Sequence, residues 1–203
     1  MFSKIFGSPK DEIWRQLAED MGGHYNENDW LGADKLTYCN DDWEMALDTF
    51  EDGWDESSLP NTRMRAPFLN KFGLEFKIYR SGFFSNLATK VLNLQDIEIG
   101  EPDFDEKFII KSNSEAGVRK LLAPAEIRAL IDTQPAIALA VHDDVGTFKK
   151  RYPEKVDVLH FHCLGVIKDE ERLRSLFELF VAVLNRLQEL NHAEPYQRDA
   201  GPS

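Results

Sequence analysis

Residues 35–50 read KLTYCNDDWEMALDTF and contain two segments of alternating apolar and polar side chains, separated by Asn40-Asp41-Asp42. Alternation is typical of a β-strand with one buried face, because successive side chains of a strand point to opposite sides of the sheet. Asparagine and aspartate favour tight turns. The pattern therefore predicts an antiparallel hairpin of strands 35–39 and 43–50.

Two more alternating segments extend this hairpin to an antiparallel meander; they are residues 62–68 and 74–80. Pairing Phe68 with Leu74 across the loop 69–73 gives the second hairpin one wholly apolar face and sets Arg65 opposite Lys77. A slip of one residue would place the arginines of this hairpin against apolar partners, so we expect this register.

Helices are expected to flank the sheet. Pro9 and Gly22 have the types and positions of a helix start and a helix end. Ser112 and Glu115 have the spacing of a capping box, which predicts a second helix. Asp169 caps a long final helix, whose wide apolar stripe is typical of a helix lying on a sheet. The other expected elements are strands at 94–99, 107–111, 137–142 and 156–167, a short helix at 83–92, and a helix after Pro124.

These elements indicate an α+β fold: an antiparallel β-sheet meander with flanking helices and a long C-terminal helix packed on the sheet. A chain of 203 residues can bury one sizeable core, and no repeat or linker divides it. We therefore expect a single domain over residues 1–191. Residues 192–203 include Pro195, Gly201 and Pro202 and are expected to form a flexible tail.

Composition narrows the class of partner and the compartment. The chain has 36 acidic and 24 basic residues and a net charge of −12, whereas nucleic-acid binding needs clustered Lys and Arg, so no nucleic-acid partner is expected. No apolar run has the length of a membrane span, and residues 1–7 are too short for a signal peptide. Cys39 and Cys163 lack the spacing of a disulfide scaffold or a zinc ribbon. A cytoplasmic protein is predicted.

Acidic and basic side chains are segregated along the chain. Residues 41–56 hold eight carboxylates and no lysine or arginine. In a continuous meander, Glu44 and Asp48 become cross-strand neighbours of Arg63 and Arg65, so internal pairing is the expected explanation. The surplus acid lies in the following loop, which is a candidate binding site for a basic protein surface through Trp54, Asp55 and Glu56.

Arg63, Arg65 and Lys77 also form the basic concentration of the predicted hairpin. Guanidinium and ammonium groups bind phosphate oxygens, so these three residues are a candidate site for an anionic group. The alternative function that follows is a peripheral binder of anionic lipid.

His160 and His162 are the best candidates for metal ligands. They lie two residues apart in an expected strand, so both side chains project from the same face. Imidazole nitrogens bind zinc, and a carboxylate from elsewhere would complete a metal-dependent hydrolase site. The other interpretation is that both histidines share a half-covered face while Leu159, Phe161 and Cys163 pack on the core side. Complete sites need more ligands than these two, so no cofactor is expected.

Other catalytic signals are weak. The chain contains no GxGxxG, GxxxxGK[ST], HExxH or GxSxG motif. His142-Asp143 looks like a strand exit, and Asp103, Asp105 and Glu106 lack the glycine and terminal glutamate of a calcium loop. The sequence therefore predicts a non-catalytic interaction or binding module.

Residues 103–143 carry one further pattern. Phe104-Asp105 and Phe108 precede a strand, and a helix then ends at Leu121-Leu122-Ala123-Pro124. This FDxxF, strand, helix, LLxP order resembles a family of uncharacterised bacterial proteins, whose members often carry membrane-spanning segments outside this module. The resemblance implies no reaction, substrate or site residue. Physically, Phe104 and Phe108 are expected to anchor the core.

Overall fold

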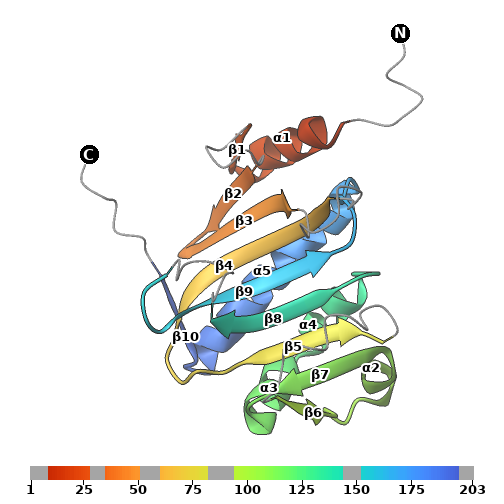
Figure 1. Ribbon diagram of the computed structural model, residues 1–203, viewed down its shortest axis with the longest axis vertical. Helices are drawn as coiled ribbons and strands as arrows, with labels where there is room; N and C mark the ends of the chain where they lie inside the picture. Colours follow the sequence, from red (N-terminus) through yellow and green to blue (C-terminus); the bar gives the residue numbers. More distant parts are fainter. Residues whose placement is uncertain (1–8, 28–34, 51–59, 82–93, 144–151, 197–203) are drawn as a thin grey trace.

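One antiparallel sheet of ten strands organises the protein, and the long helix α5 crosses one of its faces (Figure 1). The structure is a computed structural model that describes residues 9–27, 35–50, 60–81, 94–143 and 152–196. The strands are β1 (His24–Asn26), β2 (Lys35–Asn40), β3 (Trp43–Phe50), β4 (Asn61–Asn70), β5 (Phe76–Arg80), β6 (Gln95–Ile97), β7 (Phe108–Ser112), β8 (Ala138–Asp143), β9 (Val156–Cys163) and β10 (Ala193–Pro195).

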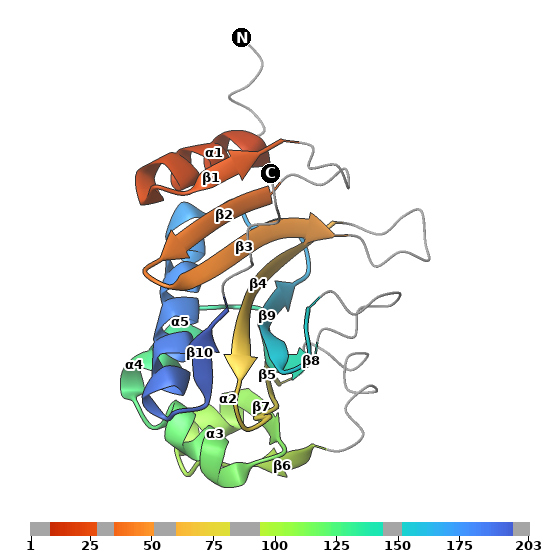
Figure 2. The ribbon, with the colours of Figure 1, turned by 90° about the vertical axis from the view of Figure 1, so that its left-hand side faces the viewer.

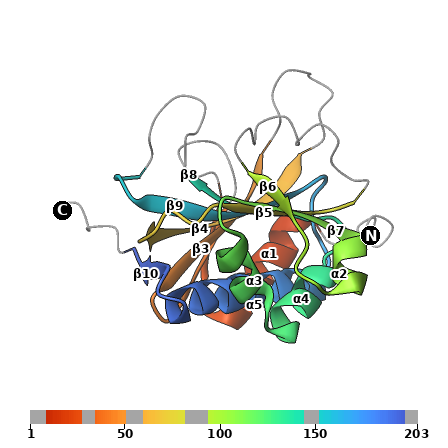
Figure 3. The ribbon, with the colours of Figure 1, turned by 90° about the horizontal axis from the view of Figure 1, so that it is seen from below.

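The described helices are α1 (Lys10–Met21), α2 (Pro102–Lys107), α3 (Glu115–Leu122), α4 (Ala125–Asp132) and α5 (Glu170–Glu189). Figure 3 shows α1, α3, α4 and α5 on the same side of the sheet, and Figure 2 shows α4 and α5 on that side with the sheet seen nearly edge-on. The predicted α+β class is therefore confirmed, with the long C-terminal helix on the sheet.

Strand order across the sheet is β1-β2-β3-β4-β9-β8-β5-β7-β6, and β10 adds to β4. One register row crosses eight strands and is apolar throughout; its members are Leu36, Leu47, Met64, Phe161, Leu139, Ile78, Ile110 and Ile97. All eight side chains are buried, in the same core cluster as the apolar side chains of α5. Because every strand places an apolar residue at the same height, the row forms the centre of the core.

The predicted hairpin of residues 62–80 is wrong. β4 and β5 are not neighbours, because β9 and β8 lie between them. Eight residue pairs join β4 to β9, whereas β5 has five residues. A ladder of eight residue pairs has room for more backbone hydrogen bonds and more cross-strand side-chain contacts than a ladder of five. The predicted register nevertheless survives as alignment, since Arg65 and Lys77 share one row with His160 and Ala140 between them.

Pro67 lies inside β4 at a place where the sheet tolerates a proline. The pairing of β3 with β4 ends at Arg65, and the pairing of β10 begins at Phe68. Proline lacks the backbone N–H that a ladder requires, so a position between two partner strands costs it little. The same arrangement places β10 within residues 192–203, which the sequence assigns to a flexible tail; residues 197–203 lie outside the described ones.

Helix boundaries follow local chemistry. Gly22 ends α1 in the left-handed conformation with φ 73°. The Asp169 carboxylate accepts a hydrogen bond of 2.7 Å from the Arg172 backbone N–H and begins α5 as predicted. The cap of α3 is Ser114, not Ser112, and it accepts from the Gly117 N–H at 3.2 Å.

Phe104 and Phe108 are buried, with ring centroids 4.5 Å apart, so their predicted place in the core is confirmed. Asp103, Asp105 and Glu106, which lack the features of a calcium loop, lie in α2. Strand β9 ends at Cys163, shorter than the predicted 156–167, and the helix predicted at 83–92 lies outside the described residues.

Candidate binding face of the sheet

The sheet face turned away from the helices carries most of the site candidates, and we call it the polar face. Two adjacent register rows define it. Counted from β2 onward, the first consists of Thr37, Ala46, Arg65, His160, Ala140, Lys77, Lys111 and Asp96, and the second of Lys35, Asp48, Arg63, His162, Ala138, Tyr79 and Ile109. The predicted anion site and the predicted metal site are therefore parts of one surface.

Asp48 is the buried acid of the polar face, with 4% of its surface exposed. Its carboxylate accepts hydrogen bonds from Arg63 Nε at 2.8 Å and Nη2 at 2.9 Å. It also accepts from Arg65 Nη2 at 2.6 Å. The expected internal pairing is confirmed for this acid, but one carboxylate serves two guanidinium groups. Counted over these three side chains alone, two cations therefore face one anion.

The Phe50 ring lies beside an arginine and a histidine of the polar face. The Phe50 ring centroid lies 5.0 Å from Arg63 Cζ and 6.3 Å from the His162 ring in an edge-on arrangement. His160 and His162 lie with ring centroids 5.4 Å apart and planes tilted by 53°. The sequence prediction that both histidines share one face is confirmed, with Leu159, Phe161 and Cys163 buried on the other face.

Lys77 lies two strands from His160 across β8 and has an altered acidity. Burial lowers the pKa of Lys77, and the neighbouring Lys111 lowers it further. The hydrogen bond from Lys111 to Asp96, at an ion-pair distance of 2.9 Å, raises the pKa of Lys111. Between Lys77 and His160, strand β8 contributes Ala140, whose side chain is a single methyl group. No bulky side chain of β8 therefore separates the lysine from the histidine in this row.

Metal ligands are not assembled in the described part of the chain. Among those residues no group of three or more His, Cys, Asp or Glu side chains could hold a metal ion. Asp105 instead accepts hydrogen bonds from the backbone N–H groups of Ile99 and Gly100, both at 2.9 Å, and of Glu101 at 3.1 Å. This aspartate therefore fixes the chain ahead of α2. His142 and Asp143 form the end of β8.

The acidic loop candidates Trp54, Asp55 and Glu56 lie outside the described residues, so binding of a basic protein surface there stays a prediction. Within the described chain, no helix combines the length and apolar composition needed to cross a membrane.

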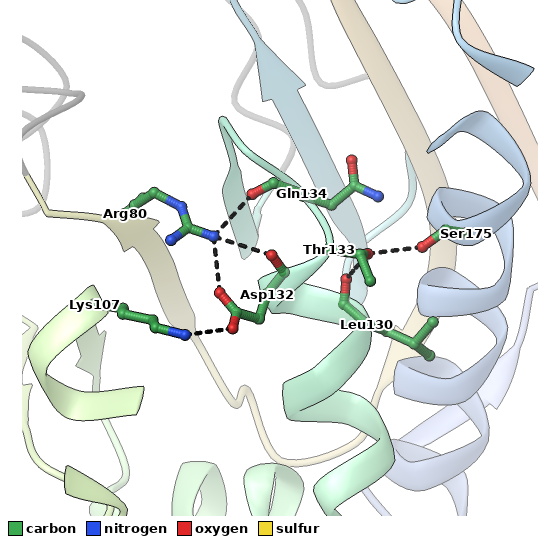
Figure 4. A network of polar contacts seen from close by, with 7 residues as sticks. All are labelled: Arg80, Lys107, Leu130, Asp132, Thr133, Gln134 and Ser175. Atoms are coloured by element: carbon green, nitrogen blue, oxygen red, sulfur yellow. Dashed lines mark hydrogen bonds and ion pairs between the residues drawn. The ribbon is translucent and has the colours of Figure 1, made fainter. Parts of the chain in front are cut away.

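A polar network missing from the sequence predictions fixes the connection from α4 to β8 (Figure 4). Arg80 Nη2 donates to the Asp132 carbonyl at 3.1 Å, to Asp132 Oδ1 at 3.0 Å and to the Gln134 carbonyl at 3.3 Å. Lys107 Nζ lies 2.6 Å from Asp132 Oδ2, and this bond, helped by Arg80, lowers the Asp132 pKa. The network holds the segment that places β8, and therefore its two alanines, between β9 and β5.

Sequence patterns gave no signal for this network, because its members come from β5, α2 and α4 and meet only after the sheet has formed. Thr133 Oγ1 and Ser175 Oγ, 2.8 Å apart, tie the same segment to α5. The contacts are structural, and they lie on the helix side of the sheet.

Comparison of the chain with protein-family models, with curated proteins and with solved structures found no significant match. The resemblance of residues 103–143 to an uncharacterised bacterial family therefore stays a prediction.

Proposed function

We propose that the chain is a non-catalytic binding module whose polar face binds an anionic group of the phosphate type. The alignment of Arg65, His160 and Lys77 in one register row carries the proposal. Neighbouring strands lie about 4.8 Å apart, and Ala140 of β8 lies between His160 and Lys77, so the backbones of these two residues are separated by two strand spacings. Their long side chains can contact one tetrahedral anion above Ala140. Such an anion would accept hydrogen bonds from cationic donors on both sides.

Charge on the polar face supports the same ligand. Among the residues that the structure describes, its two defining rows contain the cations Lys35, Arg63, Arg65, Lys77 and Lys111 but only the carboxylates of Asp48 and Asp96. The excess is positive in a chain whose net charge is −12. A bound anion would also favour the charged form of Lys77, which burial and Lys111 disfavour in the free protein.

Calorimetric titration with inorganic phosphate tests the proposal. We expect saturable binding that weakens at least tenfold in Lys77→Met, which removes the charge and keeps most of the side-chain length. Lys168→Met is the matched control, because Lys168 is exposed and precedes α5 outside the polar face. Equal phosphate affinity of the Lys77 variant and the wild-type protein would exclude the polar face as the site.

Vesicles distinguish a soluble anion from a lipid headgroup. Phosphatidylcholine vesicles are compared with vesicles that also contain phosphatidylglycerol, in sedimentation with and without free phosphate. Cosedimentation with the anionic vesicles alone, lost in Lys77→Met, identifies a peripheral lipid binder. Phosphate binding without cosedimentation identifies a soluble anionic ligand.

A metal-dependent hydrolase is the second candidate, because the imidazole rings of His160 and His162 lie 5.4 Å apart. Zinc binds imidazole nitrogen at about 2.0–2.1 Å, so rings at this separation can both reach one ion after small side-chain rotations. The candidate requires stoichiometric metal in purified protein and its loss in His160→Ala. A metal-free preparation that stays folded contradicts it.

A further inference from the structure

A groove lies along the outer side of α5, in the helical layer and away from the polar face. Its volume is about 680 Å³, and its walls come from α4, from the end of α1 and from β2. The α5 residues that line it run from Arg174 to Glu189. At about 1.5 Å per residue, this length is about 22 Å, or about four turns of a helix.

The floor of the groove is apolar. Leu130 of α4 and Val181 and Ala182 of α5 line it and are partly buried. Deeper in the groove, the Phe177 ring meets the Tyr38 ring edge-on at a centroid distance of 5.6 Å. Partly exposed apolar side chains that are contiguous between two helices mark a place where further apolar surface can be buried.

The rim of the groove is negatively charged, because its cations are already paired. Arg174 forms ion pairs with Asp20 at 2.8 Å and with Glu170 at 2.7 Å. Arg186 pairs with Glu189 at 2.9 Å. By contrast, Glu126 and Glu178 are exposed and have no ion-pair partner among the residues that the structure describes.

We infer that the groove binds a basic amphipathic helix of a partner protein, with apolar side chains on the floor and lysine or arginine beside Glu126 and Glu178. The backbone N–H and C=O groups of α4 and α5 are hydrogen-bonded within their own helices, so these helices cannot pair with an added β-strand through backbone hydrogen bonds. A helix satisfies its own backbone and presents side chains alone. Attraction between its basic side chains and the two glutamates of the rim would orient the partner helix in the groove.

Charge also decides against two other occupants. A second copy of this chain would carry a net charge of −12 to a groove that is itself acidic, and in a two-fold dimer the same glutamates would face one another. An anionic membrane would be repelled by the same carboxylates. A basic partner protein would not be repelled by these carboxylates.

Fluorescence anisotropy with a synthetic peptide tests the inference. The probe is a labelled 14-residue peptide of leucine and lysine in helical period, and its control is a scrambled peptide of equal composition. We expect the helical probe to bind at least tenfold more tightly than the scrambled one. Glu178→Lys and Val181→Asp should each weaken binding about tenfold or more, whereas Glu154→Lys, the same charge reversal at an exposed site outside the groove, should change it less than threefold.

Circular dichroism and the thermal midpoint establish that each variant is folded. If Glu178→Lys does not fold, Glu178→Gln replaces it as the milder substitution. Equal binding of the two peptides, or equal effects of Glu178→Lys and Glu154→Lys, would overturn the inference. So would a dimer in sedimentation equilibrium that Val181→Asp dissociates. Lys77→Met should leave peptide binding unchanged, so the experiment on this groove is independent of the phosphate-binding proposal for the polar face.

Discussion

Replacing Asp48 by asparagine keeps the shape of the side chain but removes its negative charge and replaces one of its two oxygens, which accept three hydrogen bonds from Arg63 and Arg65, by a donor amide group. The Asp48 side chain is 6% exposed, that of Arg65 13% and that of Arg63 27%. Removing one member of a buried ion pair costs about 3–5 kcal/mol, because the remaining charge loses its compensation. Arg63 retains some contact with water, so we expect the lower part of this range.

The expected loss is about 3 kcal/mol in the free energy of unfolding, measured by urea denaturation at pH 7. For a chain of this size, 1 kcal/mol corresponds to about 2–4 °C, so the thermal midpoint should fall by about 6–12 °C. Glu44→Gln is the matched control, since Glu44 lies on the same strand and is only partly buried. Its effect should stay within about 0.5 kcal/mol.

A double-mutant cycle separates the ion pair from general damage. Arg65→Met removes one of the two guanidinium groups, so Asp48→Asn should cost about 1–2 kcal/mol less in that background. A loss below about 1 kcal/mol for Asp48→Asn, or a coupling energy near zero, would refute the buried pairing as a source of stability. Under the proposed function, Asp48→Asn should also tighten phosphate binding, because it adds net positive charge to the polar face.

Three further predictions concern stability. Burial, with a contribution from Lys120, lowers the pKa of His192 from 6.5, so the folded state binds this proton less readily than the unfolded state. Stability should therefore fall as the pH drops from 6.5 through the folded pKa, and His192→Asn should flatten this part of the urea profile; an unchanged profile would contradict the assignment. Gly22→Ala should cost about 1–2 kcal/mol, since Gly22 has φ 73° and an added Cβ meets nothing within 4 Å, so the cost is one of backbone conformation alone. Leu139→Ala, in the middle of the apolar row, should cost about 2–5 kcal/mol in urea denaturation, and a loss below about 1 kcal/mol would mean that the row is not closely packed.

Local features were predictable from sequence, because their causes lie within a few residues. Pro9 and Gly22 delimit α1, and Asp169 begins α5 through a bond to the third residue after it. Alternation in residues 156–163 identified the core side of β9 for the same reason. Each of these predictions depends on backbone geometry and side-chain period alone.

Strand partners were not predictable, because alternation assigns a face and not a neighbour. Five residues separate β4 from β5, and 85 separate β4 from β9. Loop closure costs about 0.6 kcal/mol for each doubling of loop length. The shorter connection therefore favours pairing of β4 with β5 over pairing with β9 by only about 2.5 kcal/mol. Three additional residue pairs in the β4–β9 ladder outweigh that advantage when their side chains are buried.

The candidate site suffered from the same error. His160 and His162 were correctly assigned to one face, and Asp48 was correctly expected beside the arginines. The sequence nevertheless suggested two unrelated sites. Only the pairing of β4 with β9, which sets Arg63 opposite His162 and Arg65 opposite His160, joins them.

The distance along the chain between β4 and β9 has a consequence for synthesis on the ribosome. β4 is synthesised long before residues 156–163 leave the ribosome, so one edge of β4 stays unpaired until β9 is available. Exposed strand edges invite pairing with other nascent chains, and charged side chains and proline discourage it. Arg63, Arg65 and Pro67 occupy this waiting strand. We therefore expect the arginines that shape the polar face of the finished protein also to disfavour aggregation of the chain during translation.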